Sequence, residues 1–125
     1  MTPRGVDTEA VLVAHLRATV GPYVSTRTPN PLPLPYIKIT RTGGGRDDLV
    51  VDASTHLVQV WADPAADSPA DLPLDVQAAL WAAEGHAVRG VHLVEVACTN
   101  PASLPDPDTG AARYVMTCTV TAHTI

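Results

Sequence analysis

The sequence contains no phenylalanine, and only five of its 125 residues are aromatic. Large aromatic rings therefore contribute little to the core, which must be built mostly from the 18 alanines and 16 valines. Cysteine is also scarce, since Cys98 and Cys118 are the only two. A chain of this length buries about two thirds of its unfolded surface. We therefore expect one domain, spanning residues 1–125, that needs no disulfide framework.

Long hydrophobic runs are missing as well. The apolar stretch 10–16 is too short to span a bilayer, and it follows Asp7 and Glu9 instead of the basic region of a secretory signal. We expect no membrane partner and take the cytoplasm as the default compartment. In that compartment the two cysteines are expected to be a reduced buried pair in preference to a disulfide.

Positive charge is in short supply, with 8 basic residues against 13 acidic ones and a formal net charge of −5. This balance disfavours broad nucleic-acid binding. The charge is unevenly spread, however: residues 1–46 carry six basic and two acidic side chains, a net +4, while residues 47–125 carry a net −9. One interpretation is chance clustering on a solvated surface. The other is a subunit with faces of opposite sign, suited to head-to-tail contact with its own copies.

Hydrophobic spacing predicts an α+β fold in the order helix, three strands, helix, two strands. The first helix is expected at 8–20, capped by Asp7 or Thr8 and ended by Gly21-Pro22. The second is expected at 73–84. Strands are expected at 24–27, 36–41, 55–62, 91–98 and 114–122. They should form a mixed or antiparallel sheet of about four or five strands, with both helices packed on one face.

Two segments rich in proline or glycine are expected to lie outside this framework. Residues 29–35 contain four prolines, which predicts an extended polyproline-like surface arm acting either as a connector or as a docking arm. Residues 43–45 are three glycines, predicted to be a flexible hairpin tip. A phosphate-binding loop would need Lys and Ser or Thr next, whereas Arg46, Asp47 and Asp48 follow here.

No pattern in the sequence predicts catalysis or metal binding. Ser54 does not lie in a nucleophile elbow, and Cys98 and Cys118 lack a basic neighbour that would activate a thiol. The segment 106–110 is expected to be a turn leading into the last strand. The five histidines lack ligand spacing and are expected to be core or surface residues: His15, His56, His86, His92 and His123. The acids Asp47, Asp48 and Asp52 lack a calcium-loop pattern. We therefore expect no enzyme, no cofactor and no metal.

A set of short motifs nevertheless follows a recognisable order. The motifs are 24–31, 37–44, 60–63 and 104–107, followed by Gly110 and by Arg113-Tyr114 before a threonine-rich strand. In order, spacing and total length the sequence resembles the small tail terminator proteins of long-tailed, siphovirus-like bacteriophages that infect high-GC hosts. The resemblance covers about residues 11–122. One lysine against seven arginines, with abundant alanine, also fits a high-GC genome.

The resemblance implies a structural role. It implies an α+β protomer that assembles into a ring, usually a hexamer, on the last ring of tail-tube protein. Such a ring stops tube polymerisation and presents a surface to the head–tail connector, while DNA passes through its lumen without specific binding. The implied location is the head-proximal end of the tail in the virion, after assembly in the host cytoplasm. The three glycines, Asp47-Asp48, Pro69 and Pro73 depart from the family pattern.

The charge pattern and the resemblance together single out a group of charged residues as an assembly interface. These residues are Arg27, Lys38, Arg41, Arg46, Asp47 and Asp48. Two other functions stay open from the sequence. One is a head–tail connector or neck completion protein of similar fold, and the other is a small cytoplasmic enzyme without a recognisable motif.

Overall fold

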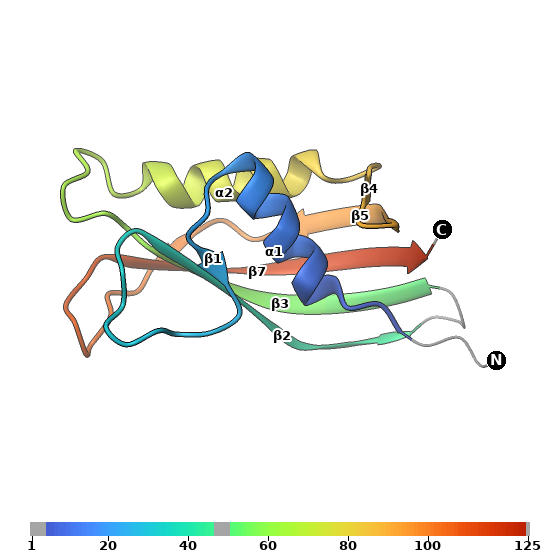
Figure 1. Ribbon diagram of the computed structural model, residues 1–125, viewed down its shortest axis with the longest axis horizontal. Helices are drawn as coiled ribbons and strands as arrows, with labels where there is room; N and C mark the ends of the chain where they lie inside the picture. The colour runs from blue at the N-terminus through green and yellow to red at the C-terminus, as the bar shows by residue number, and fades with distance from the viewer. Residues whose placement is uncertain (1–4, 47–50, 125) are drawn as a thin grey trace.

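The computed structural model describes residues 5–46 and 51–124 and has two layers, with two helices covering one face of a curled sheet (Figure 1). The helices are α1 (Thr8–Thr19) and α2 (Asp71–Ala82). The strands, in chain order, are β1 (Val24–Ser25), β2 (Tyr36–Arg46), β3 (Val51–Trp61), β4 (Ala87–Val88), β5 (Val91–Cys98), β6 (Ala102–Ser103) and β7 (Arg113–Thr124). The α+β class and the two helices agree with the sequence prediction.

Among the described residues the sheet has seven strands, so the expectation of four or five was too low. Its order is β1-β2-β3-β7-β5-β4, and β6 pairs with β7 beside this path. β1 runs parallel to β2, and the other pairings are antiparallel. The two strands absent from the prediction, β4 and β6, have two residues each. So short a strand shows no alternation that could reveal it in a sequence.

Helix α1 begins and ends close to its predicted bounds. The Asp7 carboxylate accepts a hydrogen bond from the Ala10 amide at 3.0 Å, which caps the helix. Helix α2 begins at Asp71, two residues before the prediction, because Pro73 falls in its first turn, where the missing amide hydrogen costs no helical bond. No helix in the described ranges is long and apolar enough to cross a membrane.

The three glycines lie inside strand β2 and not at a hairpin tip, which corrects the sequence prediction. Gly43, Gly44 and Gly45 pair with residues 53–55 of β3, after a register shift between Arg41 and Gly43. A side chain at Gly44 would place its Cβ 2.1 Å from the Ala53 carbonyl oxygen. The glycine is therefore required by close strand approach.

One apolar core joins both helices to the sheet. Strand β3 alternates between buried and partly buried residues along its length, and its inward side chains include Val58 and Val60. The other sheet face is not covered by a helix (Figure 1), and Thr117 and Thr119 are exposed on it. The segment 29–35 contains neither helix nor strand, and its residues are exposed or half-buried.

Candidate functional site

Buried polar groups cluster where the segment just before α1 contacts the first half of β3. Asp52, Ser54 and His56 point inward from alternate positions of β3, and all three are at most 2% exposed. The Asp52 carboxylate accepts hydrogen bonds from the Val6 amide at 3.1 Å and from the Ser54 hydroxyl at 2.5 Å. It also forms an ion pair with the Arg41 guanidinium at 3.0 Å. We call Val6, Arg41, Asp52 and Ser54 the Asp52 cluster.

The charge of Asp52 is stabilised by this arrangement. Burial by itself raises the pKa of the carboxyl group, because it penalises the charged form. Hydrogen bonds from Ser54, Val6 and Arg41 outweigh that effect and leave the pKa below its ordinary value. Arg41 also donates to the Val6 carbonyl oxygen at 2.7 Å, and its own amide donates to the Glu9 carboxylate. The cluster therefore fastens residues 6–9 to β2 and β3.

His56 is a second anchor for the same segment. Its Nδ1 lies 3.2 Å from the Cys118 carbonyl oxygen, which can only accept, so Nδ1 carries the hydrogen. The other ring nitrogen, Nε2, then accepts from the Thr8 hydroxyl at 2.8 Å. A neutral ring satisfies both contacts. Burial lowers the pKa of His56 below its ordinary value and favours that neutral form.

We expect His56 to make the protein less stable in mild acid. The unfolded chain protonates this histidine below pH about 6.5, while the folded chain resists protonation. The stability linked to His56 is therefore complete above that pH and is lost as the pH falls toward the folded pKa. Urea unfolding of wild type and His56→Gln between pH 7.5 and 5 measures this. The unfolding free energy of His56→Gln should depend less on pH than that of wild type. If the two free energies changed in parallel with pH, His56 would not be the group responsible.

This polar group does not have the geometry of a hydrolase. Ser54 donates to Asp52, and His56 contacts Thr8, so the serine has no hydrogen bond to the histidine that could activate it. The two cysteines pair with each other. Cys98 and Cys118 are free thiols paired across β5 and β7, with Sγ atoms 2.9 Å apart. The Cys118 thiol lowers the pKa of Cys98, and the pKa of Cys118 is raised by the same contact and by burial.

The remaining histidines serve packing or lie at the surface. His15 hydrogen-bonds through Nε2 to the Ala79 carbonyl oxygen at 2.7 Å and so ties α1 to α2. The rings of His92 and His123 lie 5.0 Å apart across β5 and β7, and His86 is exposed. Within residues 5–46 and 51–124, no three potential ligands of the His, Cys, Asp or Glu type come together to hold a metal.

A second cluster lies around Trp61 at the opposite end of β3. The indole of Trp61 is 3% exposed and donates through Nε1 to the Asp106 carboxylate at 2.9 Å. The Arg113 guanidinium lies 5.9 Å from the centre of the indole ring, within range of a cation–π contact. Tyr36 lies on the same indole, with ring centres 6.0 Å apart, and its hydroxyl donates to the Arg27 carbonyl oxygen. We call Tyr36, Trp61, Asp106 and Arg113 the Trp61 cluster.

Asp106 organises the loop that reaches this cluster. The Trp61 N–H and then the Asp108 amide hold the pKa of the Asp106 carboxyl below its ordinary value. The Asp108 amide donates to this carboxylate at 2.9 Å, and the Gly110 amide donates to the Asp106 carbonyl oxygen at 2.8 Å. The predicted turn at 106–110 is therefore present, and its first residue is also the partner of Trp61. The sequence analysis assigned Asp106 to the turn only, since the indole lies 45 residues away.

The structure describes the side chains of three of the six residues predicted as an assembly interface. Arg27 is exposed beside β1, Lys38 is partly exposed on β2, and Arg41 forms an ion pair with Asp52 while its side chain stays 34% exposed. The Arg46 side chain, Asp47 and Asp48 lie outside the described residues. Because Arg41 holds the amino-terminal segment, reversing its charge would alter folding as well as any contact between copies. Comparison with known proteins finds no matching family model and no matching curated sequence.

Proposed function

We propose that this chain is a structural subunit of a long-tailed bacteriophage, forming a ring that caps the tail tube. In that role it ends tube polymerisation and joins the tail to the head connector. The ring is a homo-oligomer, a hexamer by the resemblance, at the head-proximal end of the tail. Its function is assembly, without a cofactor or a catalytic step.

The observation that carries the proposal is where the motifs of the resemblance lie in the fold. The motif 60–63 supplies Trp61, the motif 104–107 supplies Asp106, and the Arg113-Tyr114 pair supplies the guanidinium against the indole. The motif 24–31 reaches the same cluster through the Arg27 carbonyl oxygen. Four segments from three distant parts of the sequence thus converge on the Trp61 cluster. Motifs that match by chance have no reason to meet at one place in the structure. Their meeting at the Trp61 cluster therefore supports the resemblance.

The decisive experiment is to image phage tails assembled without this protein. If the chain caps the tube, its loss should give tubes that keep growing, with a broad length distribution well beyond that of normal tails. Negative-stain electron microscopy of lysates measures the lengths directly. Adding back purified protein during tail assembly should restore a single length.

The alternatives predict different particles. A connector or neck protein would leave tails of normal length that fail to join filled heads, and that result would overturn the capping role. An enzyme would leave assembled virions of normal appearance. A binding assay with purified tail-tube protein and purified portal separates the first two in solution. The proposed ring should bind the tube protein and not the portal.

A further inference from the structure

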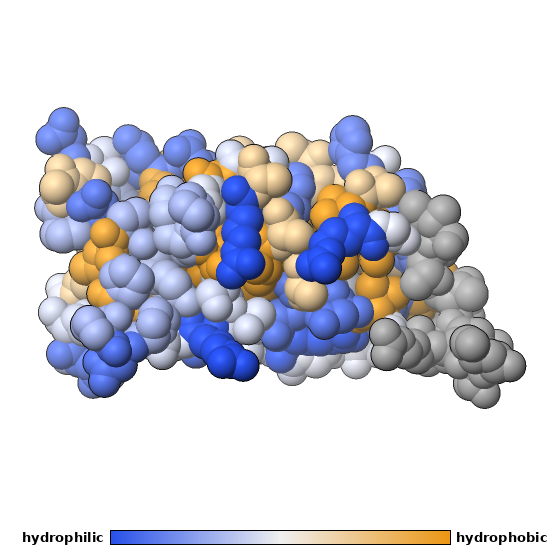
Figure 2. Space-filling view, in the orientation of Figure 1, coloured by the Kyte–Doolittle hydropathy of each residue, from blue (hydrophilic) through white to orange (hydrophobic). Residues whose placement is uncertain are grey.

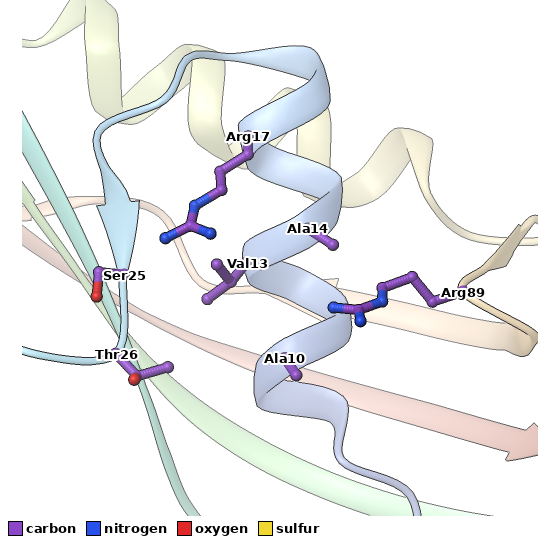
Figure 3. Close-up of a pocket in the computed structure, with 7 residues that line it drawn as sticks. All are labelled: Ala10, Val13, Ala14, Arg17, Ser25, Thr26 and Arg89. Carbon is purple, nitrogen blue, oxygen red and sulfur yellow. The ribbon is translucent and has the colours of Figure 1, made fainter.

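A shallow groove beside α1 carries positive charge on an apolar floor. Its floor is formed by the small side chains of Ala10, Val13 and Ala14, and Arg17 and Arg89 lie at its rim (Figure 3). Figure 2 likewise shows strongly hydrophilic side chains directly over hydrophobic surface in this region. The groove holds about 250 Å³, less than the roughly 300–1,000 Å³ usual for small-molecule sites. Its size favours a few side chains of a protein partner.

Neither arginine of the groove is neutralised within the described part of the chain. Arg17 donates through Nε to the Val24 carbonyl oxygen at 2.8 Å, which fixes its side chain across the groove. The one ion pair between described residues is Arg41 with Asp52, so no described carboxylate lies within 4 Å of Arg17 or Arg89. Two guanidinium groups without a counter-charge among the described residues make a site for carboxylates, which arginine binds in bidentate fashion.

The backbone at Arg89 is unusual in a way that points to function. Arg89 and Gly90 form the two-residue turn between β4 and β5, with φ of 53° and 76°. Such turns favour Asn or Gly at the first position, because a side chain there is disfavoured at positive φ. An arginine held in this conformation suggests that its side chain is needed where the turn places it. That place is the rim of the groove.

Helix α2 presents the complementary surface. Asp71, Leu74, Asp75, Ala78 and Trp81 are all exposed and follow one another at helical spacing on its outer face. Leu74 is 50% exposed and Trp81 is 53% exposed. Residues 63–84 also contain five acidic side chains and no Lys or Arg. We call the five exposed residues the acidic stripe.

We propose that the acidic stripe of one copy docks into the Arg17–Arg89 groove of the next copy. This inference rests on the proposed ring and names the contact that builds it. The two carboxylates of the stripe meet the two guanidinium groups, and Leu74 with Trp81 covers the small-residue floor. Tryptophan and arginine are the residues that most often dominate interface energies. The stripe lies on α2 and the groove beside α1 (Figure 1), so the contact joins two different surfaces, as a closed ring requires.

Two charge-reversed variants test this contact. The groove variant combines Arg17→Glu with Arg89→Glu, and the stripe variant combines Asp71→Arg with Asp75→Arg. Each variant alone opposes like charges at every contact, so its subunit dissociation constant should rise about a hundredfold or more. Mixed in equal amounts, the two should assemble again, because each groove then meets an oppositely charged stripe. Light scattering coupled to gel filtration measures the particle mass, and native mass spectrometry should find equal numbers of both variants in each ring.

The matched control is Glu95→Arg with Asp108→Arg, which makes the same net charge change on exposed residues outside the stripe. It should assemble like wild type, and circular dichroism should show all three variants folded. Variants that assemble alone, or a mixture that stays dispersed, would overturn this contact and leave the ring proposal standing. A wild-type chain that stays monomeric even with tail-tube protein would overturn both. Loss of DNA retention by the groove variant, with assembly unchanged, would instead assign the groove to nucleic-acid phosphates.

Discussion

Replacing Asp52 by asparagine is expected to lower the free energy of unfolding by about 3 kcal/mol, the lower end of the cost of removing one partner from a buried ion pair. The lower end applies because the Arg41 side chain is 34% exposed, while that of Asp52 is 2% exposed. Asparagine has nearly the same shape as aspartate. Every partner of Asp52 is a donor, however, so the new amide hydrogens would face the Val6 amide or the Arg41 guanidinium.

The partly exposed Asp63 offers a matched control for this substitution. Its carboxylate accepts from the Ala65 amide at 2.9 Å, a local contact that asparagine reproduces. Asp63→Asn should therefore change stability by less than about 0.5 kcal/mol. Urea unfolding at pH 7 measures both variants. Equal small losses for the two would contradict the anchoring role of the Asp52 cluster.

Acid should erase the difference between wild type and Asp52→Asn. The folded pKa of Asp52 lies below its ordinary value, so its contribution to stability is complete above pH about 3.9 and is lost as the pH falls through the folded pKa. A protonated aspartic acid resembles asparagine in charge. The gap between the two unfolding free energies should therefore close in acid, and a gap that stays constant would mean that the charge is not what stabilises the segment.

Local features of the sequence were enough to predict much of the fold. The helix α1 is bounded by a capping side chain at Asp7 and by Gly21-Pro22, and these signals act over one turn. The long strand β7 alternates apolar and threonine residues, so its inward side chains, such as Met116 and Val120, could be assigned in advance. These signals can be recognised in the sequence without knowing which residues pack against the helix or the strand.

The partners of the buried polar residues could not be predicted in the same way. Asp52 bonds to an amide 46 residues away, and Trp61 bonds to a carboxylate 45 residues away. Each choice depends on which strands become neighbours, and this is settled by packing of the whole chain. Arg41 was expected to contact another copy because its charge stood in a basic segment. Strand pairing also brings it to Asp52, a contact within the chain that its charge alone did not predict.

The two surfaces of the proposed contact were missed for a related reason. In helix α2 the helical spacing of Val76 and Leu80 indicates which stripe packs inward, but it does not mark the outward residues as a contact surface. The sheet covers Val76 and Leu80, which leaves Leu74 and Trp81 outward. Arg89 belongs by sequence to the acidic part of the chain, yet the turn at Arg89-Gly90 returns it to the basic groove. The sequence signal for that turn is the pair Arg89-Gly90, which lies between Val88 and Val91.

Replacing Gly44 by alanine is expected to destabilise the protein by about 3 kcal/mol or more, the sum of a strained backbone and an overpacked contact. Gly44 has φ of +119°, and its added Cβ would lie 2.1 Å from the Ala53 carbonyl oxygen and 2.6 Å from the Ser54 Cα. Both neighbours are backbone atoms of β3, so they cannot swing aside. The strands must separate there, and Arg41 on β2 moves away from Asp52 on β3 as they do.

The neighbouring glycines separate the two causes. Gly43 also has a positive φ, at +146°, but a Cβ there meets nothing within 4 Å, so Gly43→Ala should show the backbone cost alone. A Cβ at Gly45 likewise meets nothing within 4 Å, and alanine there should be close to neutral. Thermal unfolding of the three variants should rank Gly44→Ala as the least stable, then Gly43→Ala, then Gly45→Ala. If Gly44→Ala matched Gly45→Ala, β2 and β3 could not approach as closely as the structure has them, and the strand pairing that positions Arg41 beside Asp52 would be wrong.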